Sequence, residues 1–236
     1  MRIFVDPADL SAGTRVVRGD EHHYIAIVRR ARVGDAVELV DGSGRRATAT
    51  IAAIAGDATT ITVGTPETIV QKPPHVRAIV PLIKGDRMDV CLEKLVEVGV
   101  DAIVVYAATR SVVRLEPDRR DARLAKYHAA VQAAARQSGR AQIPSVRIVD
   151  DARAAIASLV GSTVRIVLDP ASDTPLTVGD EVDVTIASGP EGGFTADERL
   201  HFVNAGFAPT GLGPRILRAE TAPIVAVSVI RTLTRS

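Results

Sequence analysis

Two glycine-rich segments are the parts of this sequence best suited to chemistry. The first, residues 188–195, reads SGPEGGFT and follows the apolar run 182–187, which predicts a buried strand. The second, residues 211–222, reads GLGPRILRAETA and also links an apolar stretch to a predicted helix. Glycine lets a backbone approach a ligand closely, and open α/β sheets bind ligands at the carboxyl ends of their strands. The two segments therefore predict a pair of ligand-binding loops.

Several common ligand classes are disfavoured at these loops. No Gly-Lys-Ser/Thr follows the first loop, and the Gly-x-Gly-x-x-Gly spacing of dinucleotide sites is absent. Ser188 has no evident histidine partner, so a hydrolase triad is disfavoured. For one such segment alone, the simplest alternative to a ligand-binding loop is a tight turn between a strand and a helix. Two such segments in one chain make this purely structural interpretation less favoured.

Arginine dominates the positive charge of the chain. Four of the 29 basic residues are lysines, which leaves 25 arginines, and residues 110–147 hold nine basic and three acidic side chains. Arginine binds phosphate in a fixed fork geometry. We expect a phosphate-contacting rim at Arg110, Arg114, Arg136, Gln137 and Arg140, with Gln137 and Arg140 on one helix face. A GC-rich genome or a solvated helix end would give a similar pattern.

Other features limit the class of protein. The one cysteine, Cys91, excludes an internal disulfide and a multi-cysteine zinc site, and we expect it in the core. His22 and His23 lack partners at metal spacing, so no metal is predicted. No apolar run of 18 residues and no signal peptide is evident, so we expect no membrane contact and a cytoplasmic protein. Aromatic residues make up 3% of the chain, too few for a base-stacking platform.

The expected elements divide the chain into two domains, 1–72 and 73–236. The first is β-rich and barrel-like, with strands at 37–40, 45–54 and 59–63 and one helix capped by Asp20, whose apolar stripe is Tyr24, Ile27 and Val28. A proline-containing linker is expected at 65–75. The second domain alternates strands and helices, which predicts a mostly parallel sheet. Its expected strands are 76–82, 102–107, 146–149, 164–168 and 182–187, and its expected helices include 86–98, 117–138, 152–159, one capped by Thr195, and 220–234.

At these motifs the chain resembles a known family, the ribosomal small-subunit RNA uridine-N3 methyltransferases of the SPOUT superfamily. GPEGGF at 189–194 and LGPRILRAETA at 212–222 carry the resemblance most strongly. It extends through KGDRM at 84–88, Lys94 to Gly99, RSVV at 110–113, QSGR at 137–140 and, near the N-terminus, His23, Val28, Arg30 and Gly34-Asp35. Motifs of both domains occur in order, so the resemblance covers nearly the whole chain.

The resemblance implies an α/β-knot domain at 73–236, with a trefoil knot, and a PUA-like RNA-binding domain at 1–72. It implies a homodimer that methylates N3 of a uridine in 16S ribosomal RNA with S-adenosylmethionine as the methyl donor. The implied RNA-binding set adds Arg29 and Arg30 to the rim described above. The implied cofactor pocket consists of Leu168, Ser188, Gly189, Gly193, Leu212, Gly213 and Leu217.

Some assignments stay open at the level of sequence. Glu220 is the candidate general base, with helix capping as its alternative role, and Arg110 is a candidate for polarising the uracil carbonyls. Ser188, Tyr127 and Pro223 depart from the residues usual in the family, which puts a cofactor contact and a packing or base contact in question. The functional alternatives are a non-catalytic RNA-binding protein and an enzyme that methylates a ribose 2′-hydroxyl, although the Asn-x-Gly-x-x-x-Arg-type motif of the latter is absent.

Overall fold

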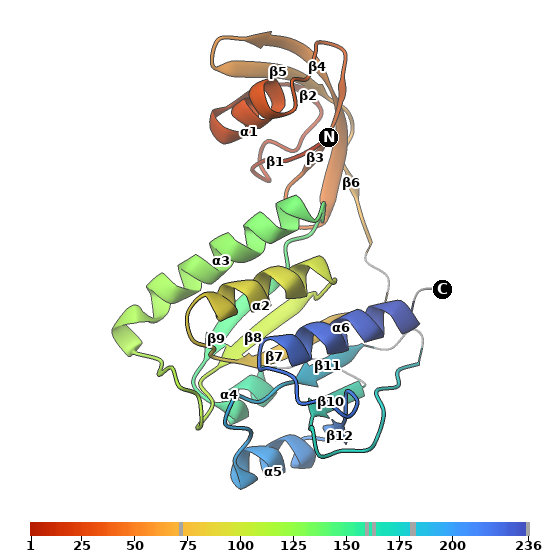
Figure 1. Cartoon of the computed structure of the whole chain (residues 1–236). Coiled ribbons are helices and arrows are strands. Elements are labelled where there is room, and N and C mark those ends of the chain that lie inside the picture. The colour runs from red at the N-terminus through yellow and green to blue at the C-terminus, as the bar shows by residue number, and fades with distance from the viewer. Residues whose placement is uncertain (71–72, 159–160, 162–163, 180–182, 235–236) are drawn as a thin grey trace. The chain divides into compact units, whose positions relative to one another are not determined.

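The computed structural model describes the chain except for residues 71–72, 159–160, 162–163, 180–182 and 235–236 (Figure 1). It contains two compact units. The first consists of Met1–Gln71 with Ala135–Ile143, and the second of Lys72–Ala134 with Pro144–Ser236. The segment 135–143 was not assigned to the first unit from the sequence. The functional boundary at residues 72 and 73 stays a prediction.

The first unit is built on a six-stranded sheet. Its strand order is β1-β3-β4-β5-β2, with β6 paired to β4, and only the β1–β3 pair is parallel. Alternation along β4 turns Ala47, Ala49 and Ile51 inward, because successive side chains of a strand face opposite sides. The strands are β1 (Arg2–Phe4), β2 (Gly13–Arg18), β3 (Ala36–Val40), β4 (Arg45–Ala55), β5 (Ala58–Val63) and β6 (Glu67–Thr68).

The helix of the first unit differs from the expected one. α1 (Gly19–His23) has Arg18 at its N-cap position without a side-chain cap, so Asp20 lies inside the first turn and is not the cap. The π-helical turn η1 (Tyr24–Val28) follows, and Arg29 N donates to Tyr24 O at 2.9 Å. The wider turn shifts the buried face to Ile25. Ile27 and Val28 are 60% and 59% exposed, so the predicted apolar stripe is wrong.

The second unit holds a six-stranded sheet in which every described pair is parallel. The order is β12-β10-β11-β7-β8-β9. β7 and β11 are buried on both faces, as is typical of a sheet covered by helices on either side. The strands are β7 (Val76–Pro81), β8 (Ala102–Tyr106), β9 (Ser145–Val149), β10 (Val164–Leu168), β11 (Val184–Ala187) and β12 (Ala208–Thr210). The predicted mostly parallel α/β sheet is therefore confirmed.

Helices α2 and α6 lie side by side across this sheet, and α6 contacts β7 and β11 (Figure 1). α4 and α5 pack together over an apolar cluster of the second unit. In this cluster Phe202 contacts Tyr106, Phe194 and Phe207 edge to face. Cys91 is fully buried in α2, as expected. The helices are α2 (Asp86–Glu97), α3 (Arg120–Gln137), preceded by the 3-10 turn η2 (Pro117–Arg119), α4 (Ala152–Ala157), α5 (Ala196–Asn204) and α6 (Thr221–Leu233).

Three further details bear on the predictions. Thr195 and Glu198 form the predicted capping box of α5. α3 ends at Gln137, and Gly139 then takes a φ of +70°, so Gln137 and Arg140 do not share a helix face as predicted. β2 and β12 were not predicted. β2 has one fully buried residue and β12 contains a proline, so neither shows an apolar alternation in the sequence.

Candidate functional site

A cavity of about 770 Å³ opens in the second unit where β10, β11 and β12 end. Its size is within the range of small-molecule sites, roughly 300–1,000 Å³. Two loops form much of its wall: the first glycine loop (residues 188–195), which follows β11, and the second glycine loop (residues 211–220), which follows β12. The lining includes all seven residues expected to bind the cofactor, namely Leu168, Ser188, Gly189, Gly193, Leu212, Gly213 and Leu217.

The first glycine loop is fixed by its own turn and by packing. Gly193 has a φ of +68° and donates its N–H to Pro190 O at 2.8 Å. The Phe194 ring lies 5.3 Å from the Phe202 ring, centroid to centroid. A Cβ at Gly189 would lie 3.1 Å from the Phe194 ring, so this position favours glycine.

The start of the loop is also hydrogen bonded to the sheet. Ser188 N donates to Ile79 O at 2.9 Å, and the Tyr106 hydroxyl donates to Ser188 O at 3.0 Å. Burial raises the pKa of Tyr106 well above its ordinary value, so the phenol stays protonated and able to donate. The Ser188 hydroxyl lies 3.5 Å from Ile79 O, which gives this departure from the family pattern a partner in the sheet.

Glu198 and Arg110 join the first glycine loop to the segment after β8. The buried Glu198 carboxylate accepts hydrogen bonds from Thr109 N and Thr195 N, each at 2.8 Å. Burial acts to raise the pKa of Glu198, but the hydrogen bonds from Thr109 and Thr195 outweigh it, so the pKa lies below its ordinary 4.5. Arg110 lines the cavity, and its Nη1 donates to Gly192 O at 3.1 Å and Phe194 O at 3.4 Å.

The second glycine loop is held closely only at its two ends. Gly211 N donates to Thr174 O at 2.9 Å, and a Cβ at Gly211 would lie 2.1 Å from Ser172 O, so no other residue fits there without a shift of backbone. Residues 213–216 are exposed, Ile216 to 87%, whereas Leu212 and Leu217 are half-buried. At the far end Glu220 is buried.

Arg87 of α2 joins the two loops. Its Nη2 lies 2.9 Å from Glu191 Oε1 of the first glycine loop, and its Nη1 lies 3.8 Å from Glu220 Oε2 of the second. The Glu220 side chain is 10% exposed. Glu220 occupies the N-cap position of α6, but its side chain makes no capping hydrogen bond, so the alternative role as a helix cap is not observed. Burial, together with the Glu220 charge, raises the pKa of the Cys91 thiol in α2 to about 12, so this cysteine stays protonated.

The acidic side chains that line the cavity do not include Glu220, the predicted general base. Glu191 and Asp169 line it, and Asp169 forms an ion pair with Arg199 of α5. Ala219 and Ala222, on either side of Glu220 in the sequence, line the cavity, whereas Glu220 does not. Its role as a base stays a prediction.

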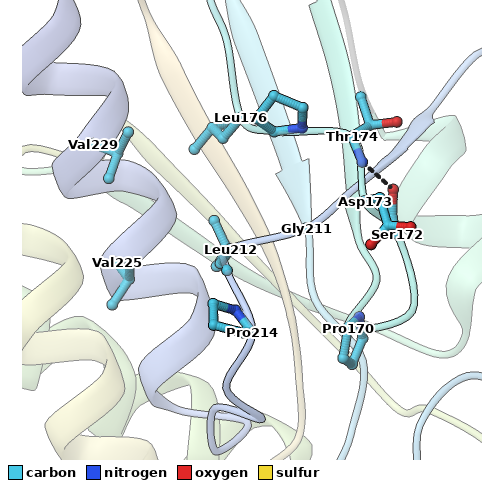
Figure 2. Close-up of a pocket in the computed structure, with 12 residues that line it drawn as sticks. Pro170, Ser172, Asp173, Thr174, Leu176, Gly211, Leu212, Pro214, Val225 and Val229 are labelled. Atoms are coloured by element: carbon cyan, nitrogen blue, oxygen red, sulfur yellow. Dashed lines mark hydrogen bonds between the residues drawn. The ribbon is translucent and has the colours of Figure 1, made fainter.

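A second cavity, of about 520 Å³, adjoins the first and shares Pro170, Leu212 and Gly213 with it. In Figure 2, Leu176, Leu212, Val225 and Val229 converge from the 170–176 segment, the second glycine loop and α6. The Ser172 hydroxyl accepts from Thr174 N at 3.2 Å and shapes the polar side of this hollow. The lining is mostly apolar side chains and backbone.

The residues expected to contact RNA are divided between the two units. Arg110 and Arg114 belong to the second unit, whereas Arg29, Arg30, Arg136, Gln137 and Arg140 belong to the first. Arg136 pairs with Glu21 at 2.6 Å and lies 5.2 Å above the Phe4 ring, so its charge is already partly compensated. Arg29 and Arg30 are exposed after η1, and Arg30 has a φ of +50°. Tyr127 is 5% exposed, which favours its packing role over contact with a base.

Several residues at the cavity were not predicted. Arg87, Asp169, Arg199, Arg215 and Arg218 all line it. Arg215 and Arg218 lie inside the LGPRILR motif, so their position in the sequence was a signal for them. Among the described residues, no group of three or more His, Cys, Asp or Glu side chains is arranged to hold a metal ion, and no helix is long and apolar enough to cross a membrane.

The parallel sheet, the glycine-loop cavity and the sequence define an RNA methyltransferase. The family model for an RNA methyltransferase domain matches residues 70–231, and the model for an RNA methyltransferase PUA domain matches residues 17–63. The chain therefore belongs to this RNA methyltransferase family, with an N-terminal PUA-like domain. This confirms the predicted RNA methyltransferase family and the predicted α/β fold with an N-terminal PUA-like domain.

The named relatives are more specific. The chain is 31% identical to ribosomal RNA small subunit methyltransferase E of Mycobacterium tuberculosis, over 99% of this chain and 92% of that protein. It is 29% identical to the Bacillus subtilis protein of the same name, over 93% of this chain and 90% of that protein.

Solved structures give the same result. Ribosomal RNA small subunit methyltransferase E from Neisseria gonorrhoeae, bound to S-adenosylmethionine, superposes with a TM-score of 0.83 at 30% identity, covering 99% of this chain and 97% of that one. A Legionella pneumophila protein, solved with bound S-adenosylmethionine, superposes with a TM-score of 0.82 at 25% identity, again over 99% and 97%. The predicted cofactor is thus the one bound in both neighbours.

Proposed function

We propose that this protein uses S-adenosylmethionine to methylate N3 of a uridine in the 16S RNA of the small ribosomal subunit. The observation that carries the proposal is the cavity between the two glycine loops, which brings together seven residues from three separated segments. The named relatives support the small-subunit substrate. The N3 position rests on the resemblance of the loop motifs.

The cavity fits the cofactor in size and in chemistry. Leu168, Leu212 and Leu217 offer apolar walls, and Gly193 leaves open space where a side chain would stand. Positive φ angles at Gly193 and Gly213 turn the backbone in ways that other residues adopt only with strain. When bound, S-adenosylmethionine supplies a methyl group carried on a positively charged sulfur.

The main task of the residues that line the cavity is alignment. Good positioning of two reacting groups is worth about 7–11 kcal/mol, whereas a general base contributes roughly 10²–10⁴-fold in rate. We therefore assign the larger share of catalysis to the two loops. Arg110 is suited to hold a uracil carbonyl, because among the described residues its hydrogen bonds all come from Nη1, which leaves its other donors available.

The uracil N3 proton must leave for the methyl group to bind there, and a carboxylate of the protein is a candidate acceptor. Glu220 is the base predicted from the sequence, but its carboxylate is enclosed. Glu191 is favoured by a specific observation, since it lines the cavity itself. Glu191→Gln and Glu220→Gln separate the two: the base variant binds cofactor normally and turns over roughly 10²–10⁴-fold more slowly.

The function is tested by mapping modified nucleotides in 16S RNA from cells with and without this gene. We expect one uridine to lose a base methyl group in the deletion strain and to regain it when the purified protein and S-adenosylmethionine are added. Identical maps would refute the proposal. Loss of a ribose methyl group instead would indicate the 2′-hydroxyl reaction.

The remaining assignments belong to the same proposal. The trefoil knot of residues 73–236 and the cytoplasmic location follow from the family resemblance and the ribosomal substrate. We propose a homodimer, for which the half-buried Val225 and Val229 of α6 and Leu176 offer apolar contact area. Sedimentation of the purified protein tests it, and a monomer at micromolar concentration would contradict it.

A further inference from the structure

The five arginines that line the large cavity fall into two groups. Three of them have partners in the protein. Arg87 pairs with Glu191, Arg199 pairs with Asp169, and Arg110 donates to backbone carbonyls of the first glycine loop.

Arg215 and Arg218 form the second group. Within the described part of the chain, neither side chain has a hydrogen-bond or ion-pair partner, and both are exposed. Two uncompensated cations therefore stand at the mouth of a cavity where every other arginine is already engaged.

Between them lies the most exposed large apolar side chain of the described residues, Ile216, at 87%. Its neighbour Leu217 is only half-exposed. Single exposed apolar residues are common on protein surfaces, but this one lines a cavity and is flanked by two free cations. That combination is suited to an anionic ligand with an apolar face, and a nucleotide in RNA has both features.

We infer that Arg215, Ile216 and Arg218, here called the RIxR lip, bind the target nucleotide at the entrance of the cavity. The inference rests on the proposed function. A base whose Watson–Crick edge is to be modified must leave its stack, and proteins often insert an apolar side chain into the gap. In the lip, Ile216 takes the place of the lost stacking neighbour, while Arg215 and Arg218 bind the flanking phosphates.

Aromatic side chains are scarce around the cavity. Stacking on Phe, Tyr or Trp is a common way to hold an unstacked base. The four phenylalanines and three tyrosines of this chain supply few such surfaces, and none of them lines the cavity except Phe194, which packs on Phe202. An aliphatic side chain is what the cavity mouth offers.

The test compares Arg215→Ala, Ile216→Ala and Arg218→Ala with Arg153→Ala, a matched control on the exposed face of α4. Binding to in vitro transcribed, unmodified 16S RNA is measured over a range of salt concentrations, and binding of S-adenosylmethionine is measured by calorimetry. We expect each lip arginine variant to bind RNA about 10-fold more weakly and to lower the salt-dependence slope by about one. Arg153→Ala and all cofactor affinities stay at the wild-type value.

Ile216→Ala is expected to reduce kcat more than RNA affinity, by about 10-fold, because alanine loses most of the apolar contact with the neighbouring bases. The inference is overturned if Arg215→Ala and Arg218→Ala bind RNA with wild-type affinity and slope, or if Ile216→Ala keeps the wild-type kcat. It is likewise overturned if Arg153→Ala weakens RNA binding equally, or if the lip variants lose S-adenosylmethionine binding instead. It is also overturned if their only change is in oligomeric mass, since the lip would then face a second copy. Failure of the wild-type protein to bind cofactor or to methylate RNA would instead refute the proposed function. The two failures can be told apart, because RNA binding is measured without cofactor.

Discussion

The two glycine loops form one cavity, yet they are held in opposite ways. The first is fastened by Phe194, by the Glu198 carboxylate and by Arg110, all of which contact the rest of the second unit. The second is fixed at Gly211 and Glu220 and exposes residues 213–216 and Arg218 between them. Preorganised groups lower the free-energy cost of binding. The difference indicates a division of tasks, with the first loop shaped for a constant small ligand and the second for a larger, variable one.

The largest effect is expected for Gly193→Val, which should abolish cofactor binding by the first loop. Valine at a φ of +68° is strained and places its side chain in the cavity. We expect affinity for S-adenosylmethionine, measured by calorimetry, to fall about 100-fold or more, equivalent to roughly 3 kcal/mol. Gly56→Val is the matched control, because Gly56 has a φ of +57° in a turn of the first unit with open space around it. Normal cofactor binding by Gly193→Val would mean that the pocket is misplaced.

Glu198→Gln tests the fastening of the first loop. The variant loses charge-assisted hydrogen bonds from Thr109 N and Thr195 N, so we expect the free energy of unfolding at pH 7 to fall by about 2 kcal/mol. Asp197→Asn, on the exposed side of the same helical turn, is expected to cost under about 1 kcal/mol.

The same carboxylate predicts a dependence on pH. Its pKa is lowered in the folded protein from the ordinary 4.5, so it stabilises the fold above that pH and the contribution is lost as the pH falls below it. Urea unfolding at several pH values should therefore show the wild type and Glu198→Gln converging in acid. A gap that is constant down to pH 3 would contradict this account.

Arg87→Met tests whether the two loops depend on each other. Removing the guanidinium leaves the enclosed Glu220 carboxylate without the cation beside it. It also removes the ion pair with Glu191, and with it the link between the two loops. We expect S-adenosylmethionine to bind about 10-fold more weakly, or roughly 1.4 kcal/mol. Adding Glu220→Gln should recover part of the loss. No recovery, or no initial loss, would mean that the loops are set independently.

The smallest effect is expected for Ile216→Ala on stability. Because Ile216 is 87% exposed, its truncation should change the free energy of unfolding by less than about 0.5 kcal/mol. Phe194→Ala in the first loop, which removes the contact with Phe202, should cost about 2 kcal/mol or more. Equal losses in urea unfolding would remove the contrast between the loops.

The sequence predicted features that depend on local pattern. Examples are the strands and helices after residue 76 and the capping box at Thr195. Each element can be predicted because its pattern of residue types lies within one short, continuous segment. The two loops were placed together because carboxyl ends of parallel strands meet at one edge of a sheet.

The features that escaped prediction depend on contacts between distant segments. Arg110 donates to Gly192 O, 82 residues away, and nothing local distinguishes it from Arg215, which has no partner among the described residues. Burial of Ile25 in place of Ile27 and Val28 depends on a π-helical turn that has no sequence signature of its own. Glu220 was proposed as a base because it adjoins the loop in sequence, although its enclosed carboxylate lies 3.8 Å from Arg87 and does not line the cavity.

The position of β11 between β10 and β7 has a consequence for synthesis of the chain on the ribosome. When residue 168 has been made, four of the second unit's strands exist, but the central position between β7 and β10 is empty. Domains fold as units, so the second unit cannot complete its sheet before β11 is made, and unpaired strand edges invite aggregation. A nascent polypeptide of this length thus carries two open edges until Val184–Ala187 emerges, and its release before then would yield a protein without a complete sheet.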